Sequence, residues 1–507
     1  MNTSNILSVD LGTTSIKLAV FSPSGQILAS STQEYALSTK NLTWVECSEE
    51  TYWNAFVNGL KALFTQNSAL AASIKALGIS AQGETLFFMD KNGKPLRDAI
   101  VWMDSRANDE SSEMKNFFGD EKCFEVTGQV EFSPCWPAAK ILWVRKNEPE
   151  IFAAADKFCL IEDWFIYRLT GRWVSEGSLL CSTVYWDIIH KNWWKEMLDF
   201  IGISENQLPE IWEPGVPVNT LLPELAKELG LPETMLVCTG ALDQAAAAIG
   251  IGNIREGIVS ENIGAALALC APVSKPLFDP SRTIPLHYFG IPNTYMLHTF
   301  TTGGMALQWF RDQFCDMEKQ RAESLKQNTY RLMDDEAGQI PAGSDGLICL
   351  PHLNGSMAPD VNPDAKGVFF GFTLKHTRAH FIRSILESLG YIILRNIESI
   401  ENTGLVIQEI RSSGGGAKSQ LWSQIKSDIV GKPLITTGSA EAACQGAAIL
   451  AGVATGIFPS IPDACEMMQG EKRRFGPDPA NKDLYRKGYS HYKMLFSSLR
   501  ELFEVSR

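Results

Sequence analysis

Short apolar runs separated by turn residues make up the first part of the chain. Residues Ile6 to Val9, Ile16 to Phe21 and Ile27 to Ala29 are rich in apolar or β-branched types, and a turn of Ser, Pro and Gly precedes the third run. This pattern predicts a β-meander near the N-terminus. Further strands are predicted at Ile74 to Ser80 and at Ala99 to Trp102.

Longer segments with apolar side chains at helical spacing lie between and after these strands. The spacing predicts helices over Trp53 to Phe64, Pro137 to Lys146 and Asp163 to Leu169. Because strands are mixed with helices along the chain, the expected fold class is α/β.

The N-terminal pattern recurs in the second half of the chain. A second meander is predicted within Gly257 to Cys270, and a helix is predicted at Met305 to Phe314. Glycines and charges interrupt the apolar run between Gly250 and Gly257. We therefore expect two lobes of similar plan, residues 1–253 and residues 254–507.

The length and charge of the chain bound its organisation and its partners. A chain of 507 residues exceeds what one hydrophobic core usually supports, so two or more domains enclosing a cleft are expected. The formal net charge is −13, and the 45 Lys and Arg residues are scattered. This balance argues against binding a phosphate backbone, and we expect no nucleic-acid partner.

The cysteine pattern and the length of the apolar segments indicate in which cellular compartment the protein is expected. The eleven cysteines are dispersed, odd in number and never spaced Cys-x-x-Cys, which argues against a zinc ribbon and a disulfide framework. The N-terminus lacks a basic segment followed by an apolar run, and no stretch reaches the roughly 20 apolar residues that span a bilayer. We expect a cytoplasmic protein without a membrane partner.

A polar hexapeptide that begins at Asp10 joins two of the predicted strands. Gly12 permits a tight turn, and the hydroxyls and amides of Thr13, Thr14 and Ser15 can donate to phosphate oxygens. Asp10 could then hold Mg²⁺ through water. For this hexapeptide alone, an ordinary hairpin turn remains the alternative.

A glycine triplet in the second half has the character of a nucleotide-binding turn. Gly414-Gly415-Gly416 follows the strand-like Ile407 to Ser412 and precedes an amphipathic stretch containing Trp422 and Ile425. Bare backbone there could approach a base or an α-phosphate at a helix start. A helix-entry loop without a ligand is the alternative.

A single carboxylate, Asp243, lies among small apolar residues at a predicted helix start. A carboxylate held near a hydroxyl can remove its proton as the hydroxyl attacks phosphorus, and Gln244 could orient the same substrate. Helix capping is the alternative for Asp243. The chain has no His-Glu-x-x-His, Gly-x-x-x-x-Gly-Lys-Ser/Thr or Gly-x-Ser-x-Gly motif, which argues against zincin, P-loop and α/β-hydrolase chemistry.

The order of these motifs resembles the FGGY family of carbohydrate kinases over nearly the whole chain. One family signature is similar to Pro137 to Asn147, and the other is similar to Gly367 to Phe372 followed by His380-Phe381 and Ser384 to Glu387. The resemblance implies two actin-like, ribonuclease-H-like ATPase domains flanking a central cleft. It further implies ATP and Mg²⁺ as cofactors, a small sugar or polyol as substrate, and a homodimer as a family-level expectation.

The resemblance also assigns roles to individual residues. It makes Asp243 the catalytic base and Asp10 the metal residue. Nucleotide contacts are implied at Gly12, Thr13, Thr14, Gly264, Gly304, Gln308, Gly415, Gly416 and Gln420. Substrate contacts are implied at Gln82, Gly83, Glu84, Asp104, Trp136 and Gln244.

The residues of the expected sugar cleft match no single substrate group. Xylulokinases typically carry Met-His where this chain has Gly83-Glu84, and glycerol kinases carry Arg-Glu there and a tyrosine in place of Cys135. Glu84 can accept two hydroxyl hydrogen bonds and Gly83 leaves volume, so D-xylulose or a related ketose is the first expectation. Glycerol, erythritol and gluconate remain alternatives.

A departure from the family pattern affects the expected activity. The family's Gly-Thr-Ser phosphate turn reads Gly264-Ala265-Ala266 here. A lost charge-assisted hydrogen bond is worth roughly 1.5–3 kcal/mol, about 10- to 100-fold in rate. A catalytically weak sugar or nucleotide sensor on the same fold is therefore the runner-up, although the retained Asp10 and Asp243 argue against it. An actin-like filament or chaperone ATPase would not need Asp243 or the two signatures.

Overall fold

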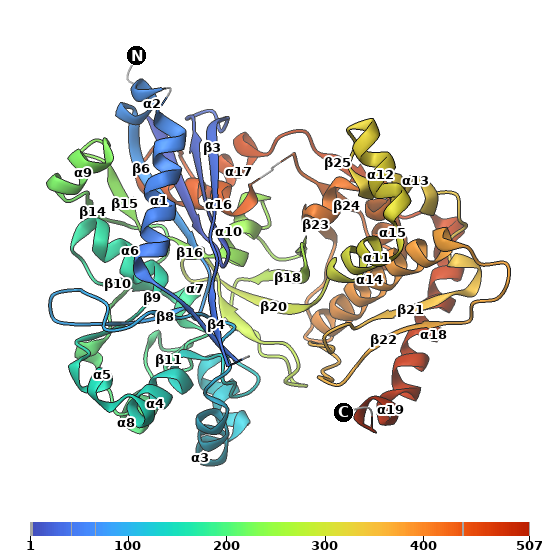
Figure 1. Ribbon diagram of the computed structural model, residues 1–507, viewed down its shortest axis with the longest axis horizontal. Helices are drawn as coiled ribbons and strands as arrows, with labels where there is room; N and C mark the ends of the chain where they lie inside the picture. Colours follow the sequence, from blue (N-terminus) through green and yellow to red (C-terminus); the bar gives the residue numbers. More distant parts are fainter. Residues whose placement is uncertain (1–3, 42, 66, 439–440, 506–507) are drawn as a thin grey trace.

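The computed structural model describes residues 4–41, 43–65, 67–438 and 441–505. It consists of two lobes (Figure 1). Each is built on a seven-stranded sheet with helices. The predicted α/β class is confirmed. No helix in the described part of the chain has the length and apolar character needed to cross a membrane.

The N-terminal sheet begins with the predicted meander. Strands β1 (Asn5–Leu11), β2 (Ser15–Phe21) and β3 (Ile27–Glu34) pair antiparallel. Strand β6 (Ile74–Ala81) then joins β1 in parallel, and β15 (Leu236–Cys238) joins β6 in parallel. Nearly all side chains of β1 and β2 are buried, so both faces of this part of the sheet are covered.

The C-terminal sheet follows the same plan. Strands β17 (Ile258–Ile263), β18 (Ala266–Val273) and β20 (Tyr295–Thr302) form an antiparallel meander. Strand β23 (Glu409–Gly414) joins β17 in parallel, and β24 (Leu434–Thr436) joins β23 in parallel. The recurrence predicted from the sequence is therefore confirmed as a repeated sheet topology.

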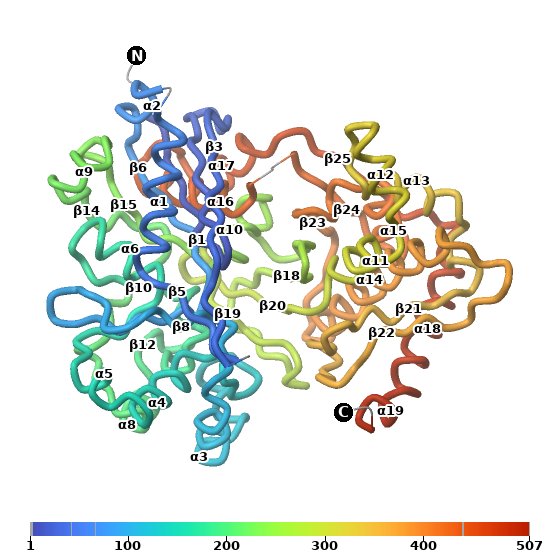
Figure 2. Tube along the Cα trace, viewed as in Figure 1, coloured from blue at the N-terminus to red at the C-terminus, as the bar shows by residue number. Residues whose placement is uncertain are grey.

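Two helices lie between the sheets. Helix α10 (Asp243–Gly250) crosses α16 (Ala442–Ala454) so closely that a Cβ on Gly446 would lie 1.8 Å from the carbonyl oxygen of Ala246. Only glycine permits this approach. Although α16 belongs to the second half of the sequence, it packs against β1 and β6 of the first lobe (Figure 2). The predicted division of the chain after residue 253 stays a prediction. Helix α16 comes from the second half of the chain but packs on the sheet of the first half.

The predicted helices of the N-terminal lobe are confirmed, and two of them, α1 and α4, begin at a capping residue or a proline. Helix α1 (Glu49–Phe64) starts after Ser48, whose hydroxyl accepts the N–H of Thr51. Helix α4 (Pro137–Asn147) starts with proline, whose missing N–H costs nothing in a first turn.

The other elements of the N-terminal lobe are β4 (Ser38–Lys40), β5 (Trp44–Cys47), α2 (Ser68–Ala72), β7 (Leu86–Met89), β8 (Ala99–Ile100), α3 (Asn108–Thr127), α5 (Pro149–Ala154), β9 (Lys157–Leu160), α6 (Ile161–Thr170), β10 (Val174–Glu176), α7 (Gly177–Leu180), β11 (Trp186–Asp187), β12 (Asn192–Trp193), α8 (Lys195–Ile201), β13 (Glu210–Trp212), β14 (Pro217–Thr220), α9 (Pro223–Leu229) and β16 (Ala241–Leu242). Those of the C-terminal part are β19 (Leu286–Tyr288), α11 (Met305–Phe314), α12 (Asp316–Leu325), α13 (Thr329–Ala337), β21 (Ile348–Pro351), β22 (Gly367–Phe370), α14 (Arg378–Glu401), α15 (Gln420–Val430), α17 (Ile461–Met468), β25 (Arg473–Phe475), α18 (Lys482–Ser498) and α19 (Arg500–Val505).

Candidate active site

Asp243 is the first residue of α10, directly after the short strand β16 beside β6. The approach to it is tight, since a Cβ on Gly240 would lie 2.1 Å from the carbonyl oxygen of Ile79. Burial raises the pKa of the Asp243 carboxyl to about 7, and the nearby carboxylates of Asp10 and Glu84 add to the rise. The group is therefore poised to exchange a proton near neutral pH.

Two buried acids hold the strand that leads to Asp243. The backbone N–H of Gly240 donates to Glu162 Oε1 at 2.7 Å, and the N–H of Leu242 donates to Ser178 Oγ at 2.8 Å. The hydroxyl of Ser178 in turn donates to Glu176 at 2.6 Å. The sequence analysis identified neither Glu162 nor Glu176. Glu162 lies among the buried apolar residues of α6.

The turn at Gly12 to Thr14 is held by two side chains, those of Gln82 and Trp102. Gln82 Nε2 donates to the carbonyl of Gly12 at 3.0 Å, and the indole Nε1 of Trp102 donates to Thr13 Oγ1 at 2.9 Å. Because the Thr13 oxygen accepts the indole proton, its own hydroxyl proton stays available to an anionic ligand. Thr14 is exposed beside it.

Asp10 lies at the end of β1, next to β6. Ser80 Oγ donates to Asp10 Oδ1 at 2.8 Å, and burial raises the pKa of the Asp10 carboxyl. Asp10 on β1 and Asp243 after β16 lie on either side of β6, and their carboxyl groups interact electrostatically.

The predicted substrate residues fall into two groups. Gln82 and Asp104 are buried with their polar atoms engaged: Gln82 with Gly12 and Thr85, and Asp104 with Arg106 and the N–H of Val45. The partly exposed group is Glu84, Trp136 and Gln244, together with the buried backbone of Gly83 next to Glu84. All six substrate contacts stay predictions, and the first group would act through its neighbours.

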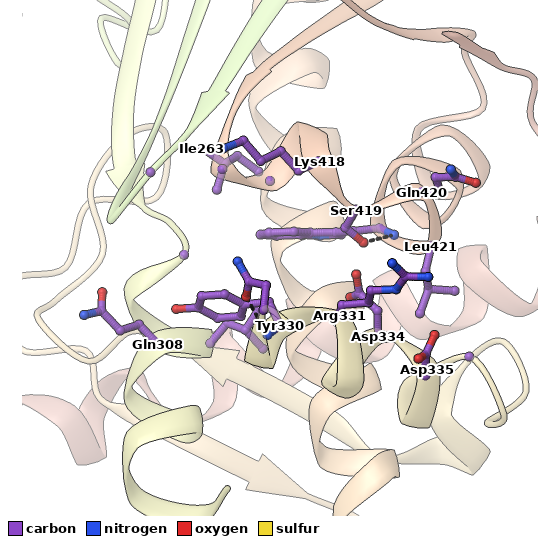
Figure 3. Close-up of a pocket in the computed structure, with 18 of the residues that line it drawn as sticks. Ile263, Gln308, Tyr330, Arg331, Asp334, Asp335, Lys418, Ser419, Gln420 and Leu421 are labelled. Atoms are coloured by element: carbon purple, nitrogen blue, oxygen red, sulfur yellow. Dashed lines mark hydrogen bonds between the residues drawn. The ribbon is translucent and has the colours of Figure 1, made fainter. Parts of the chain in front are cut away.

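A cavity of about 980 Å³ opens in the C-terminal lobe (Figure 3). Six predicted nucleotide residues line it: Gly264, Gly304, Gln308, Gly415, Gly416 and Gln420. The turn Gly12 to Thr14 belongs to the other lobe and does not line this cavity. The structure therefore brings the six C-terminal residues together, while their role in nucleotide binding stays a prediction.

The cavity depends on bare backbone at its glycines. A Cβ on Gly416 would lie 3.1 Å from Ile263 Cβ and from the ring of Trp422, and a Cβ on Gly304 would lie 2.5 Å from the carbonyl oxygen of Gly264. Ser419 caps α15 by accepting the N–H of Trp422 at 3.0 Å. A flat base and a phosphate could approach such a surface closely.

The sequence analysis did not identify the residues of α13 that line this cavity. Tyr330, Arg331 and Asp334 come from α13, and Figure 3 shows Tyr330 and Gln308 on the side of the cavity opposite Lys418. The available signal was a helix start, because Asn328 Oδ1 accepts the N–H of Tyr330 at 2.9 Å. A helix start does not tell which cavity the helix lines.

Comparison with known proteins extends these observations to the whole chain. The family model described as "FGGY family of carbohydrate kinases, N-terminal domain" matches residues 5–250, and the corresponding C-terminal domain model matches residues 269–455. A gluconokinase of Bacillus subtilis is 29% identical over 96% of this chain and 94% of its own length. A xylulose kinase of Escherichia coli is 28% identical over 98% of this chain and 99% of its own. The crystal structure of a ligand-bound xylulose kinase from Lactobacillus acidophilus, 24% identical, covers 99% of this chain and all of its own with a TM-score of 0.90, which shows a shared fold.

Proposed function

The chain belongs to the FGGY family of carbohydrate kinases, and we propose that this ATP-dependent kinase phosphorylates a terminal hydroxyl of a small neutral sugar or polyol. D-xylulose or a related ketose is the first candidate. The observation that carries the proposal is the carboxyl of Asp243, whose pKa is raised to about 7 at the start of a helix beside Asp10 and Glu84. A base with this pKa can accept the hydroxyl proton as the oxygen attacks the γ-phosphorus.

The cavity of the C-terminal lobe supplies the seat for ATP in this proposal. Its glycine-lined wall suits the base and α-phosphate, and the turn at Gly12 and Thr13 would meet the γ-phosphate from the other lobe. In-line transfer then needs the two lobes to approach, which would also exclude competing water.

The residues near Asp243 fit a magnesium ion. Among the described residues, no three His, Cys, Asp or Glu side chains gather as a metal-binding group. Mg²⁺ is usually held by one or two carboxylates together with substrate phosphates and water, and Asp10 offers one such carboxylate. When bound, the ion would offset the negative charge of the phosphates. Asp10 would hold it, and Ser80 would orient Asp10.

The charges of the predicted sugar contacts favour a neutral acceptor. Glu84 and Asp243 are the two part-exposed carboxylates here and no cation stands among the predicted contacts, whereas Asp104 is buried and paired with Arg106 and Lys140 is buried beneath Glu84. A sugar acid such as gluconate would bring a negative charge to this acidic surface without a partner. Hydroxyl groups, in contrast, can donate to Glu84.

The test is ADP release from Mg-ATP with D-xylulose, other ketoses, glycerol, erythritol and gluconate, with Asp243→Ala alongside the native protein. We expect turnover with a neutral ketose or polyol, reduced by a factor of about 100 or more in Asp243→Ala. Turnover with gluconate alone would refute the neutral acceptor. If ATP binds but none of these compounds is phosphorylated, the sensor alternative that rests on Ala265 and Ala266 would replace the kinase.

We also propose a homodimer formed through the C-terminal lobe. Phe370, Phe372 and Leu374, on β22 and the turn after it, are exposed, and β21 and β22 form a separate two-stranded sheet. Exposed apolar patches of this kind mark interaction sites. Sedimentation analysis of the native protein and of Phe372→Glu tests the proposed dimer. The substitution should weaken dimerisation and leave the fold of the monomer intact. The cytoplasmic location and the absence of nucleic-acid and membrane partners stay predictions.

A further inference from the structure

A fully buried lysine lies directly beneath the predicted sugar contacts. Lys140, on α4, has no exposed surface. Its ammonium donates to three backbone carbonyls: those of Val101 at 3.0 Å, Trp102 at 3.1 Å and Glu84 at 3.4 Å. These carbonyls belong to two separate segments, one after β6 and one after β8, so a single charge joins both.

The backbone at Glu84 is unusual and needs such support. Its φ of +54° lies in the left-handed region, which a non-glycine residue enters at a cost. The carbonyl of Gly83 accepts the N–H of Thr85 at 2.7 Å, which makes the turn still tighter. This conformation aims the Glu84 side chain, so whatever stabilises it also sets the geometry of the cleft.

The second segment connects the lysine to the phosphate turn. Trp102 offers its carbonyl to Lys140, its N–H to Thr85 Oγ1 at 3.2 Å and its indole to Thr13 Oγ1 at 2.9 Å. The Trp102 ring also packs edge-on against Phe300 of the opposite lobe, with centroids 6.4 Å apart. Lys140 therefore holds the main chain of Trp102, whereas the indole is held separately by Thr13 and Phe300.

We propose that Lys140 is a positioning residue for the acceptor sugar: its charged ammonium fixes Glu84 and Trp102 in the geometry that binds the substrate hydroxyls. This inference rests on the proposed function and adds to it a residue that does not touch the substrate. Burial lowers the pKa of Lys140 to about 8, and Cys135, Asp104 and Glu84 oppose the fall while Arg106 adds to it. These are the ionisable groups that face the ammonium. Loss of its proton above pH 8 would leave two N–H donors for three carbonyls and so weaken the link between the two segments.

The experiment compares Lys140→Met with the native enzyme, with the acceptor sugar and ATP varied separately. We expect the KM for the sugar to rise about 10-fold or more, because a small misplacement of binding groups is costly, while the KM for ATP changes less than about 3-fold. The matched control is Lys146→Met on the same helix, whose exposed ammonium pairs with Glu110 and should leave both constants unchanged.

The pH profile separates positioning from general stabilisation. In the native enzyme the sugar KM should rise above pH 8 as Lys140 loses its proton, the ATP KM should stay level, and Lys140→Met should lack this rise. An unchanged sugar KM in Lys140→Met, or an equal change in both constants, would overturn the proposal. If the variant does not fold, the native profile decides, and a sugar KM that is level from pH 7 to 9.5 overturns it. Failure of the native enzyme to phosphorylate any sugar is a different result and removes the proposed function itself.

Discussion

Glu162 accepts the backbone N–H of Gly240 at 2.7 Å, three residues before Asp243. The predicted base is thus placed by a side chain from α6, a different helix from the one that Asp243 begins. Burial raises the pKa of Glu162 well above its ordinary value, and the neighbouring Glu176 raises it further. At neutral pH these two acids therefore do not both carry a charge, and their shared task is to accept hydrogen bonds.

Replacing Glu162 by leucine should impair both stability and activity. The N–H of Gly240 would be left buried without an acceptor, at a cost of about 1–3 kcal/mol. We expect a lower melting temperature and a lower kcat, measured by calorimetry and by ADP release. The control is Glu162→Gln, whose amide oxygen can still accept the N–H. Equal losses in the two variants would show that the acceptor does not matter.

The stability of the protein should fall as the pH rises from about 4 to 7. Burial raises the folded-state pKa of Asp163 to about 7, whereas the ordinary value of 3.8 applies in the unfolded chain. The folded state therefore binds more protons in this interval, and the contribution is present below the unfolded pKa and lost through the folded pKa. Asp163→Asn, which can still accept the N–H of Leu160, should flatten the melting-temperature profile. A profile as steep as that of the native protein would contradict this.

The rate of phosphoryl transfer should fall below neutral pH. Asp243 must be ionised to accept the proton, so kcat at saturating sugar should decline as the pH drops through about 7. The charge of Glu84 contributes to that pKa, so Glu84→Gln should move the decline to lower pH. The same variant should raise the sugar KM. A decline at the same pH in both proteins would exclude electrostatic coupling between Glu84 and Asp243.

Most helices and strands named in the sequence analysis were predictable from local sequence patterns. The meanders and the helices at α1, α4, α6 and α11 were predictable because apolar periodicity and turn residues act over short stretches of chain. The crossing of α16 onto the N-terminal sheet was not, because it depends on contact between Gly446 and α10, which are far apart in sequence. The two halves have the same sheet topology, and this likeness does not indicate which of the two sheets α16 packs against.

The candidate site was predictable where a motif carried its own chemistry. Asp10, Asp243 and the triplet Gly414 to Gly416 were singled out by type and spacing. Gly264 and Gly304 were implied by the family resemblance, and the structure places these two around one cavity with Gly415 and Gly416. Lys140 and Glu162 were not found, because their importance comes from complete burial, and charged residues are usually expected at the surface. Asp104 was predicted to contact the substrate, but the structure buries it in an ion pair with Arg106, which the sequence pattern did not indicate.

Removal of the metal should stop the reaction. With EDTA in excess of Mg²⁺, we expect no ADP release with any sugar, and restored turnover when Mg²⁺ is added back. Asp10→Asn should require more Mg²⁺ for half-maximal rate, because one carboxylate charge is lost from the proposed site. A magnesium titration at fixed ATP measures this. An unchanged magnesium requirement in Asp10→Asn would rule out Asp10 as the metal residue.

Restoring a hydroxyl to the C-terminal phosphate turn should raise activity. Ala265 lies between β17 and β18, is exposed and lines the cavity of the C-terminal lobe, so a larger side chain can be accommodated there. A threonine hydroxyl donating to a phosphate oxygen contributes roughly 1.5–3 kcal/mol, and Ala265→Thr should increase kcat/KM for ATP about 10-fold or more. Valine has nearly the same shape without the hydroxyl, so Ala265→Val should give no such gain. Equal effects of threonine and valine would mean that backbone amides alone hold the γ-phosphate, and that the two alanines do not limit this enzyme.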